Sequence, residues 1–178
     1  GFVGSALLDL LQNIPEYRIL SAVRSDVDMG LPKIDTVVVG NINETTDFSA
    51  AISGVNVVVH VAARAHIMRD DVADPLAEYR KVNVEGTLNL AYQAVSAGVK
   101  RFIYISSIKV NGECTSGLTP FTEDHAAAPE DSYSVSKQEA EDALRILAQK
   151  TGLEVVIIRP ALVYGPGVKA NFLSLLKL

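Results

Sequence analysis

Short runs of apolar residues, many of them β-branched, alternate along the chain with stretches of helical periodicity. The short runs are almost wholly apolar, a pattern typical of parallel strands that helices cover on both faces. We predict strands at residues 17–23, 36–39, 55–61, 101–106 and 154–159, and helices at 3–12, 48–53, 75–97, 133–150 and 171–178. This alternation predicts right-handed crossovers and a doubly wound parallel α/β sheet.

The composition fits one folded domain and excludes several classes of protein. The chain has 178 residues, 48% of them apolar and 21% charged, so it is long enough to bury a core. The net charge of −5 and the lack of Trp argue against nucleic-acid binding, which needs a basic face to neutralise phosphates. No apolar run reaches the roughly 18–20 residues that cross a bilayer. We therefore expect no nucleic-acid or membrane partner, and a cytoplasmic location.

Cysteine and histidine usage argues against disulfides and metal sites. Cys114 is the single cysteine of the sequence, so it has no partner for an internal disulfide. The three histidines show no spacing typical of zinc ligands. We predict no bound metal, an inert Cys114, and a buried His60 whose polar atoms are satisfied within the core.

The chain opens with two glycines, Gly1 and Gly4, directly before an apolar helical pattern. This order resembles the second half of a Gly-x-x-Gly-x-x-Gly dinucleotide fingerprint, whose first glycine and preceding strand would lie upstream of residue 1. Glycine lets the backbone approach a pyrophosphate, and the helix N-terminus offers it unpaired N–H groups. The alternative is a plain glycine turn before a surface helix.

The ends of the next three predicted strands supply further candidates, because ligands of open α/β sheets bind at the carboxyl ends of strands. Arg24 follows the first of these strands, and its guanidinium suits the 2′-phosphate of NADP. Nearby Asp26 could still reach the ribose of NAD, so NADP is only slightly favoured over NAD, and a solvated Arg24 is the alternative. Asn41-Ile42 could hold the adenine, and the small Ala62-Ala63 would let a cofactor lie against the backbone.

The strongest chemical pattern is Tyr133 followed by Lys137, four residues on in a predicted helix. Residues at i and i+4 share one helix face, and a nearby cation lowers the pKa of a tyrosine toward the range of a general acid or base. Ser106-Ser107 ends a predicted strand at the same edge of the sheet, where a hydroxyl can hydrogen-bond an alcohol or keto oxygen. Together these residues predict an acid–base site.

These motifs resemble, in family order, the extended short-chain dehydrogenases/reductases, and among them the bacterial UDP-sugar 4-epimerases and 4-ketoreductases. The resemblance implies a Rossmann-like NAD(P)-binding fold, with Tyr133 as catalytic acid/base and Lys137 as its activator and ribose ligand. Ser107, five residues before Gly112 in Ser-x-x-Val-x-Gly, takes the family's hydroxyl position. The matching segments are Gly1-Phe2-Val3-Gly4, His60-Val61-Ala62-Ala63, Asn83-Val84-Glu85-Gly86-Thr87, Ser106-Ser107, Tyr133 to Lys137, Arg159-Pro160 and Val163-Tyr164-Gly165-Pro166.

The resemblance places further residues at the expected site. Ser107 is expected to contact the substrate, as are Lys169 and Asn171, with a solvated position as the alternative for Lys169. Asn83 is expected either near the active site or as a buried amide that bridges helix and strand, and Arg159 is expected to anchor backbone or carboxylates. The residues expected at the cofactor are Gly1, Phe2, Val3, Gly4, Arg24, Asn41, Ile42, Val61, Ala62, Ala63, Tyr133, Lys137 and Pro160.

The implied chemistry is hydride transfer at C4 of a UDP-linked sugar, with proton transfer by Tyr133. A 4,6-dehydratase is disfavoured, because Ile108-Lys109 stands where dehydratases of this family carry an Asp-Glu pair. Epimerase and ketoreductase both stay open, and Leu162, which replaces an asparagine common in the epimerases, weakens any transfer of sugar specificity. A steroid- or flavonoid-type ketone reductase also fits the motifs, as does a nucleotide-binding sensor or structural module without turnover.

The resemblance also sets expectations for domains and assembly. Residues 1–165 would form the NAD(P)-binding domain without its first strand. Residues 166–178 would begin the substrate-binding region, whose domain would continue beyond Leu178. Members of this family often dimerise through two long helices, here residues 75–97 and 133–150, so a homodimer with a four-helix interface is expected.

Overall fold

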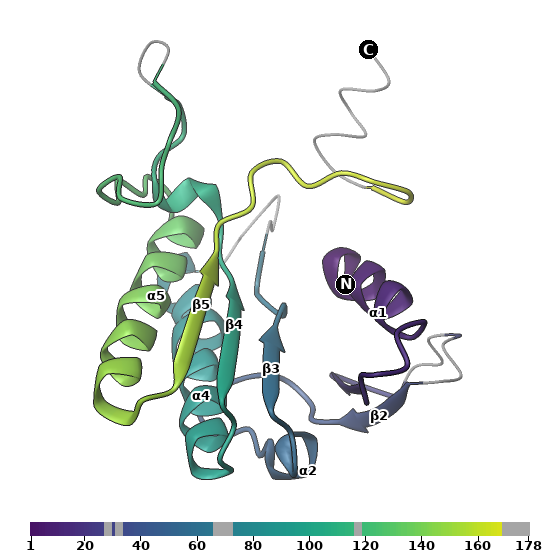
Figure 1. Cartoon of the computed structure of the whole chain (residues 1–178). Helices are drawn as coiled ribbons and strands as arrows, with labels where there is room; N and C mark the ends of the chain where they lie inside the picture. Colours follow the sequence, from purple (N-terminus) through teal and green to yellow (C-terminus); the bar gives the residue numbers. More distant parts are fainter. Residues whose placement is uncertain (27–29, 31–33, 66–72, 116–118, 169–178) are drawn as a thin grey trace.

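The computed structural model of the protein describes residues 1–26, 30, 34–65, 73–115 and 119–168. Its framework is a parallel sheet in two pieces (Figure 1). In one piece β1 (Leu20–Val23) pairs with β2 (Asp35–Val38). In the other, β4 (Arg101–Ile105) lies between β3 (Val57–His60) and β5 (Glu154–Ile158). Every pairing among these strands is parallel, which confirms the predicted fold class.

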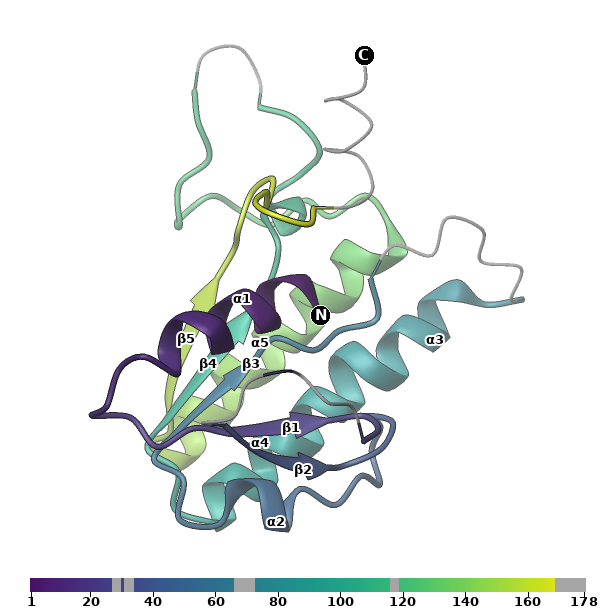
Figure 2. The ribbon, with the colours of Figure 1, turned by 90° about the vertical axis from the view of Figure 1, so that its right-hand side faces the viewer.

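Helices lie on both sides of the sheet. In chain order the helical elements are α1 (Phe2–Leu11), α2 (Ser49–Ile52), α3 (Pro75–Arg80), the π-helical η1 (Lys81–Gly86), α4 (Thr87–Ser96), the 3₁₀ turn η2 (Ile108–Val110) and α5 (Ser132–Thr151). α4 and α5 cover one face of β3–β5, whereas α1 lies on the opposite side (Figures 1 and 2). No helix within the described ranges is both long enough and apolar enough to span a membrane.

The strands are shorter than the sequence predicts, and the sheet is interrupted. The run predicted from residue 17 pairs only from Leu20, because the N–H of Tyr17 donates to Ile14 and closes the turn after α1. Similarly, the N–H of Val55 donates to Ile52 at the end of α2, so β3 begins at Val57. The sheet divides between β1 and β3, because no described strand pairs with both. Within the described residues the parallel sheet therefore consists of two separate pieces.

The stretch predicted as one helix over residues 75–97 changes its winding in the middle. It is α-helical at both ends but π-helical over Lys81–Gly86. Gly86 faces the loop after β2 so closely that a Cβ there would collide with Cγ2 of Ile42 and lie 3.2 Å from the backbone nitrogen of Asn43. This close approach requires glycine. The π segment also carries Asn83, a buried residue of the candidate site.

The core lies between β3–β5 and the helices α4 and α5. Phe102 and Tyr104 of β4 are fully buried there, against residues such as Ala91 and Leu144. On the other face of the same sheet, alternate side chains are exposed, among them Val57, Val59, Val156 and Ile158. Within the described residues, this face of β3–β5 is therefore less covered than the apolar pattern of the strands predicts.

Candidate active site

Three side chains that the sequence predicts to act together meet beyond the carboxyl end of β4. Tyr133 and Lys137 lie on the first turns of α5, and Ser107 directly precedes η2. The hydroxyl of Ser107 lies close enough to that of Tyr133 to lower the pKa of the phenol. The ring of Tyr133 also packs edge-on against Tyr79 of α3, with 6.0 Å between the ring centroids. The serine, tyrosine and lysine thus share one edge of the sheet.

Lys137 is buried, with 2% of its surface exposed. Its Nζ donates a hydrogen bond to the carbonyl of Ile105 at 2.8 Å and lies 4.4 Å from the centroid of the Tyr104 ring. Burial lowers the pKa of Lys137 to about 8, although the nearby Glu141 carboxylate acts in the opposite direction. A lysine with this pKa changes its charge close to neutral pH.

The pKa of Tyr133 lies above its ordinary value, so the prediction that Lys137 lowers it is wrong for this structure. Burial raises the pKa most and Asp131 raises it further, whereas Lys109 and the hydrogen bond from Ser107 lower it. The ammonium group of Lys137 is directed to the end of β4 instead. Ser107 and Lys109 are therefore the groups that favour the phenolate here.

Lys109 connects η2 with the start of α5. Its Nζ lies 2.9 Å from Oδ2 of Asp131 and 2.8 Å from Oε1 of Glu113. Hydrogen bonds to Glu113 and Asp131 raise the pKa of Lys109. A lysine held as a cation by two carboxylates is a poor general base, which agrees with the argument from Ile108-Lys109 against a dehydratase.

His60 and Asn83 are both buried and hydrogen-bonded. Nε2 of His60 lies 3.0 Å from Oγ1 of Thr87, and burial lowers the pKa of the ring to about 3. His60 is therefore neutral, as predicted for a satisfied core histidine. The Asn83 amide accepts the N–H of Arg64 at 2.9 Å and donates to the Arg64 carbonyl at 3.0 Å and to the Ser136 hydroxyl at 2.9 Å. Asn83 is thus a bridging amide between the segment after β3 and α5.

A buried ion pair that the sequence analysis missed lies one helical turn beyond Lys137. Nε and Nη2 of Arg159 donate to the two carboxylate oxygens of Glu141 at 2.9 and 2.6 Å. Arg159 is thus confirmed as an anchor for a carboxylate. The i+4 spacing of Glu141 from Lys137 was the available signal. An acidic residue on a helix is usually solvated, however, so the spacing alone does not identify it.

The N-terminus of α1 fits the pyrophosphate of a dinucleotide. Among the described residues, no side chain caps this 10-residue helix at Gly1, and no acidic residue lies in its first turn. Its first N–H groups are therefore open to an anion. A Cβ on Gly1 would meet no atom within 4 Å, whereas one on Gly4 would lie 3.1 Å from Cγ2 of Val61. Gly1 leaves room for a ligand, and Gly4 lets α1 pack against the end of β3. A Cβ on Gly165, beyond β5, would lie 3.7 Å from the Phe2 ring, so this helix end adjoins the catalytic edge.

The remaining residues predicted at the cofactor all follow strand ends. The carbonyl of Pro160 accepts the N–H of Ile108 at 3.0 Å and so ties the end of β5 to η2. Lys169, Asn171 and the helix predicted over residues 171–178 lie outside the described residues. Of the cofactor residues predicted from the sequence, Phe2, Val3, Arg24, Asn41, Ala62 and Ala63 are exposed, and Ile42, Val61 and Pro160 are half-buried.

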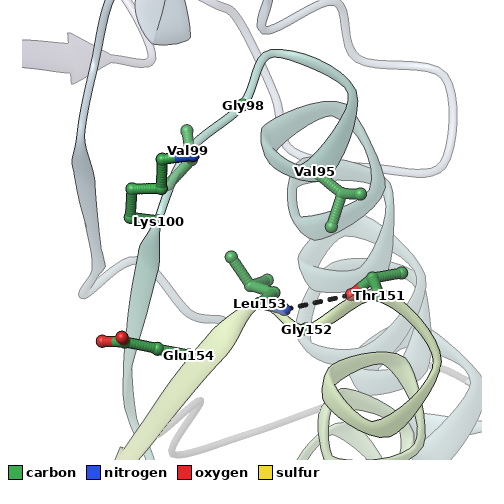
Figure 3. Close-up of a pocket in the computed structure, with 8 residues that line it drawn as sticks. All are labelled: Val95, Gly98, Val99, Lys100, Thr151, Gly152, Leu153 and Glu154. Carbon is green, nitrogen blue, oxygen red and sulfur yellow. Dashed lines mark hydrogen bonds between the residues drawn. The ribbon is translucent and has the colours of Figure 1, made fainter.

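A cavity of about 230 Å³ opens at the opposite edge, where β4 and β5 begin and α4 and α5 end (Figure 3). None of the predicted catalytic or cofactor residues lines it, so we place the site at the other edge. In the described part of the chain no group of three or more His, Cys, Asp or Glu side chains could hold a metal ion. The residues that line the cavity are Val95, Gly98, Val99, Lys100, Thr151, Gly152, Leu153 and Glu154.

An open helix N-terminus, together with a serine, a tyrosine and a lysine at one edge of a parallel sheet, is typical of a Rossmann-like protein of the short-chain dehydrogenase/reductase class. Residues 1–176 match the NAD-dependent epimerase/dehydratase family, and the chain therefore belongs to this family. The resemblance seen in the sequence to extended short-chain dehydrogenases/reductases is thereby confirmed.

Individual relatives agree with this assignment. The chain is 54% identical over 180 residues to UDP-glucose 4-epimerase of Vibrio cholerae, a match that covers 100% of this chain and 54% of that protein. It is 33% identical to N-acetyl-alpha-D-glucosaminyl-diphospho-ditrans,octacis-undecaprenol 4-epimerase of Escherichia coli O157:H7, covering 99% and 50% of the two chains. The solved structure of MoeE5 in complex with UDP-glucuronic acid and NAD superposes with a TM-score of 0.79 at 27% identity, covering 99% of this chain and 57% of MoeE5. The chain spans about half the length of the curated relatives it matches.

Proposed function

We propose that the full-length protein is an NAD(P)-dependent UDP-sugar 4-epimerase of the extended short-chain dehydrogenase/reductase type. The observation that carries this proposal is the placement of Ser107, Tyr133 and the buried Lys137 at the same edge of the sheet. The 54% identity to a UDP-glucose 4-epimerase supports the reaction. The likeness to a solved complex with UDP-glucuronic acid and NAD supports the class of substrate and cofactor.

The chain's own residues supply the proton chemistry of this reaction. When bound, NAD(P) supplies the exchange of a hydride with C4 of the sugar. Tyr133 takes the proton of the 4-hydroxyl when C4 is oxidised and returns a proton when C4 is reduced. Ser107 donates a hydrogen bond to the 4-oxygen as charge develops on it. Lys109 and the Ser107 hydroxyl favour the phenolate form of Tyr133. Lys137 adds a buried positive charge at the same edge of the sheet.

The cofactor class follows from the family, and its placement is part of our proposal. The open N–H groups of α1 would hold the pyrophosphate, and the exposed Ala62-Ala63 would leave room along the backbone. Asn41-Ile42 would hold the adenine, and Lys137 the ribose. Arg24 favours NADP, whereas the solved relative contains NAD, so the preference for NADP rests on Arg24 alone.

A 4-ketoreductase would use the same three residues and differ only in releasing the alcohol and the spent cofactor. The full-length protein should be incubated with UDP-sugars and with UDP-4-keto sugars plus reduced cofactor, while cofactor absorbance and product identity are both recorded. An inverted product without net absorbance change supports the epimerase. If an alcohol forms in proportion to the reduced cofactor consumed, the protein is a 4-ketoreductase and the epimerase proposal fails. Turnover of apolar ketones alone supports a steroid- or flavonoid-type reductase, and nucleotide binding without turnover supports a sensor or structural module.

The Tyr133→Phe variant tests the role of the phenol directly. Removing the hydroxyl removes the group that transfers the proton, so we expect kcat to fall by about 10²–10⁴-fold. Tyr17, an exposed residue before β1, provides the matched control, because Tyr17→Phe deletes the same hydroxyl away from the site. Turnover that survives Tyr133→Phe while the protein stays folded would contradict Tyr133 as the acid–base residue.

Three further parts of the proposal concern organisation. We propose that residues 1–165 form the cofactor domain. Residues 166–178 would begin the substrate region, with Lys169 and Asn171 at the substrate. The proposed location is the cytoplasm.

We also propose a homodimer through the α3–α4 and α5 helices, on which Tyr92 and Ile146 are 58% and 52% exposed. Sedimentation of the full-length protein as a monomer would count against the dimer.

A further inference from the structure

The most heavily bonded buried charge in the described chain is the carboxylate of Glu141. This side chain is 0% exposed and lies on α5, four residues beyond Lys137 and eight beyond Tyr133. Oε1 accepts the Ser106 hydroxyl at 2.5 Å and Nε of Arg159 at 2.9 Å. Oε2 accepts Nη2 of Arg159 at 2.6 Å and Nη2 of Arg145 at 2.8 Å. These four hydrogen bonds to the carboxylate all come from side chains of the protein itself.

These bonds tie together the chain segments that present the predicted catalytic residues. Ser106 immediately precedes Ser107, and its N–H donates to the carbonyl of Ile158 at 2.7 Å. Arg159 immediately precedes Pro160 and also donates from Nη1 to Asn111 at 3.1 Å. Glu141 therefore joins the end of β4, the end of β5 and the helix of Tyr133 and Lys137 at one point. A shift of any of these elements strains a bond to this carboxylate.

Glu141 also carries a charge close to Lys137. Burial raises the pKa of Glu141, but hydrogen bonds from Arg159 and Ser106 outweigh it and hold the pKa below its ordinary value. The carboxylate is thus ionised and favours the protonated form of Lys137. The other titratable groups around Lys137 are His60 of β3, which is neutral, Tyr104 of β4, whose pKa burial raises, and Tyr133 of α5. Glu141 is the negative charge among them.

We propose that Glu141 is a positioning residue for the proposed reaction, on which this inference rests. It holds Ser107 against Tyr133 through the bond to Ser106, and it holds the positive charge on Lys137 through space. Because its side chain is 0% exposed, Glu141 would act without touching substrate or cofactor. Its effect reaches the reacting atoms through two neighbours, one by geometry and one by charge, and the two routes are separable by substitution.

The charge route is tested on the protein without substrate, by NMR titration of the Cε resonance of Lys137. Glu141→Gln keeps the size of the side chain and removes its charge, so we expect the Lys137 titration to move down by about one pH unit or more. Glu139→Gln is the matched control, because Glu139 lies on the same helix and also pairs with an arginine, Arg80, but near the surface. Equal titration curves in a folded Glu141→Gln variant and in the control would overturn the charge route.

The geometric route is tested by Ser106→Ala, which breaks one bond to Glu141 and leaves every charge in place. We expect kcat to fall by roughly tenfold with the substrate KM within about twofold, because the interaction acts on the transition state. The Lys137 titration should not move. Wild-type kcat in Ser106→Ala overturns this route.

Glu141→Gln leaves the half-buried Arg159 without its carboxylate partner, which destabilises the fold. If this variant does not fold, the titration is carried out on the double variant Glu141→Gln/Arg159→Gln, which removes both charges of the pair. Should the wild-type protein turn over no UDP-sugar, the proposed function fails, but the titration still decides whether Glu141 holds the charge on Lys137. The failure of the inference and that of the function are therefore distinguishable.

Discussion

The region formed by α1, β1 and β2 differs sharply from the region formed by β4, α5 and β5. Not one residue of α1 or β2 is buried, and β1 buries only Ser21. α5 buries seven residues, including the charged Lys137 and Glu141. The second region holds its predicted catalytic side chains in place by packing and hydrogen bonds. The first region offers open backbone N–H groups and exposed side chains, whose positions depend far less on packing.

This difference assigns separate tasks to the two regions. Buried charges are costly unless they are paired, and Glu141, Arg159 and Lys137 meet that condition through hydrogen bonds to side chains and backbone. Preorganised dipoles and charges of this kind are what stabilise charge in a transition state. A helix N-terminus needs no such network to bind a phosphate, because the backbone supplies the donors. The proposed catalysis would therefore depend on the packed region, and the proposed cofactor binding on the open one.

The largest contrast is expected when one apolar side chain is truncated in each region. Phe102 of β4 is 0% exposed and Leu10 of α1 is 65% exposed. Phe102→Ala leaves a cavity in the core and should lower the free energy of unfolding by about 3–5 kcal/mol. Leu10→Ala should change it by less than about 0.5 kcal/mol. Urea unfolding of both variants measures the contrast, and similar losses at the two positions would show that the regions do not differ in packing.

Lowering the pH should destabilise the packed region through the protonation of His60. The pKa of this buried ring is about 3 in the folded protein, against 6.5 for an ordinary histidine. Below pH 6.5 the unfolded chain takes up a proton that the folded protein refuses until about pH 3, so stability is lost as the pH falls through this window. Between pH 6.5 and 5 the expected loss is about 2 kcal/mol.

Carboxylates with lowered pKa, such as Glu141 and Asp131, lose their contribution only at lower pH, so the window from 6.5 to 5 isolates the histidine. In the His60→Gln variant the urea unfolding midpoint should change less with pH across this window, even though the variant is less stable overall. A wild-type midpoint that does not change between pH 6.5 and 5 would show that His60 is accessible to protons.

The sequence predicted those parts of the site that depend on local spacing. Tyr133 and Lys137 are i and i+4 on one helix, and Ser107 follows an apolar strand, so local rules place all three at one edge. The pair of Glu141 and Arg159 escaped notice because it joins residues of different elements, and only packing decides that an acidic helix residue is buried. The same reason explains the pKa of Tyr133. Spacing indicates a nearby lysine, but it does not show that the ammonium group binds the carbonyl of Ile105.

Element boundaries show the same limit in the fold. The apolar runs located each strand of the described residues, yet they could not show that the N–H groups of Tyr17 and Val55 are used by preceding turns. Helical periodicity likewise covered residues 75–97 without revealing the π segment at Lys81–Gly86, because Gly86 meets Ile42 only in the folded chain. Patterns along the sequence report the type of an element, whereas its ends and irregularities depend on contacts between elements.

The smallest effect is expected in the open region, at Arg24. This exposed side chain follows β1, at the carboxyl edge where a cofactor would lie. An exposed ion pair is screened by water, so Arg24→Asp should weaken NADP binding by roughly tenfold at most and leave NAD binding within about twofold. Arg18→Asp, at an exposed position before β1, is the control with the same charge change. Fluorescence titrations with both cofactors measure the difference. If both cofactors lose affinity equally in Arg24→Asp, Arg24 does not contact the 2′-phosphate, and the preference for NADP loses its one supporting residue.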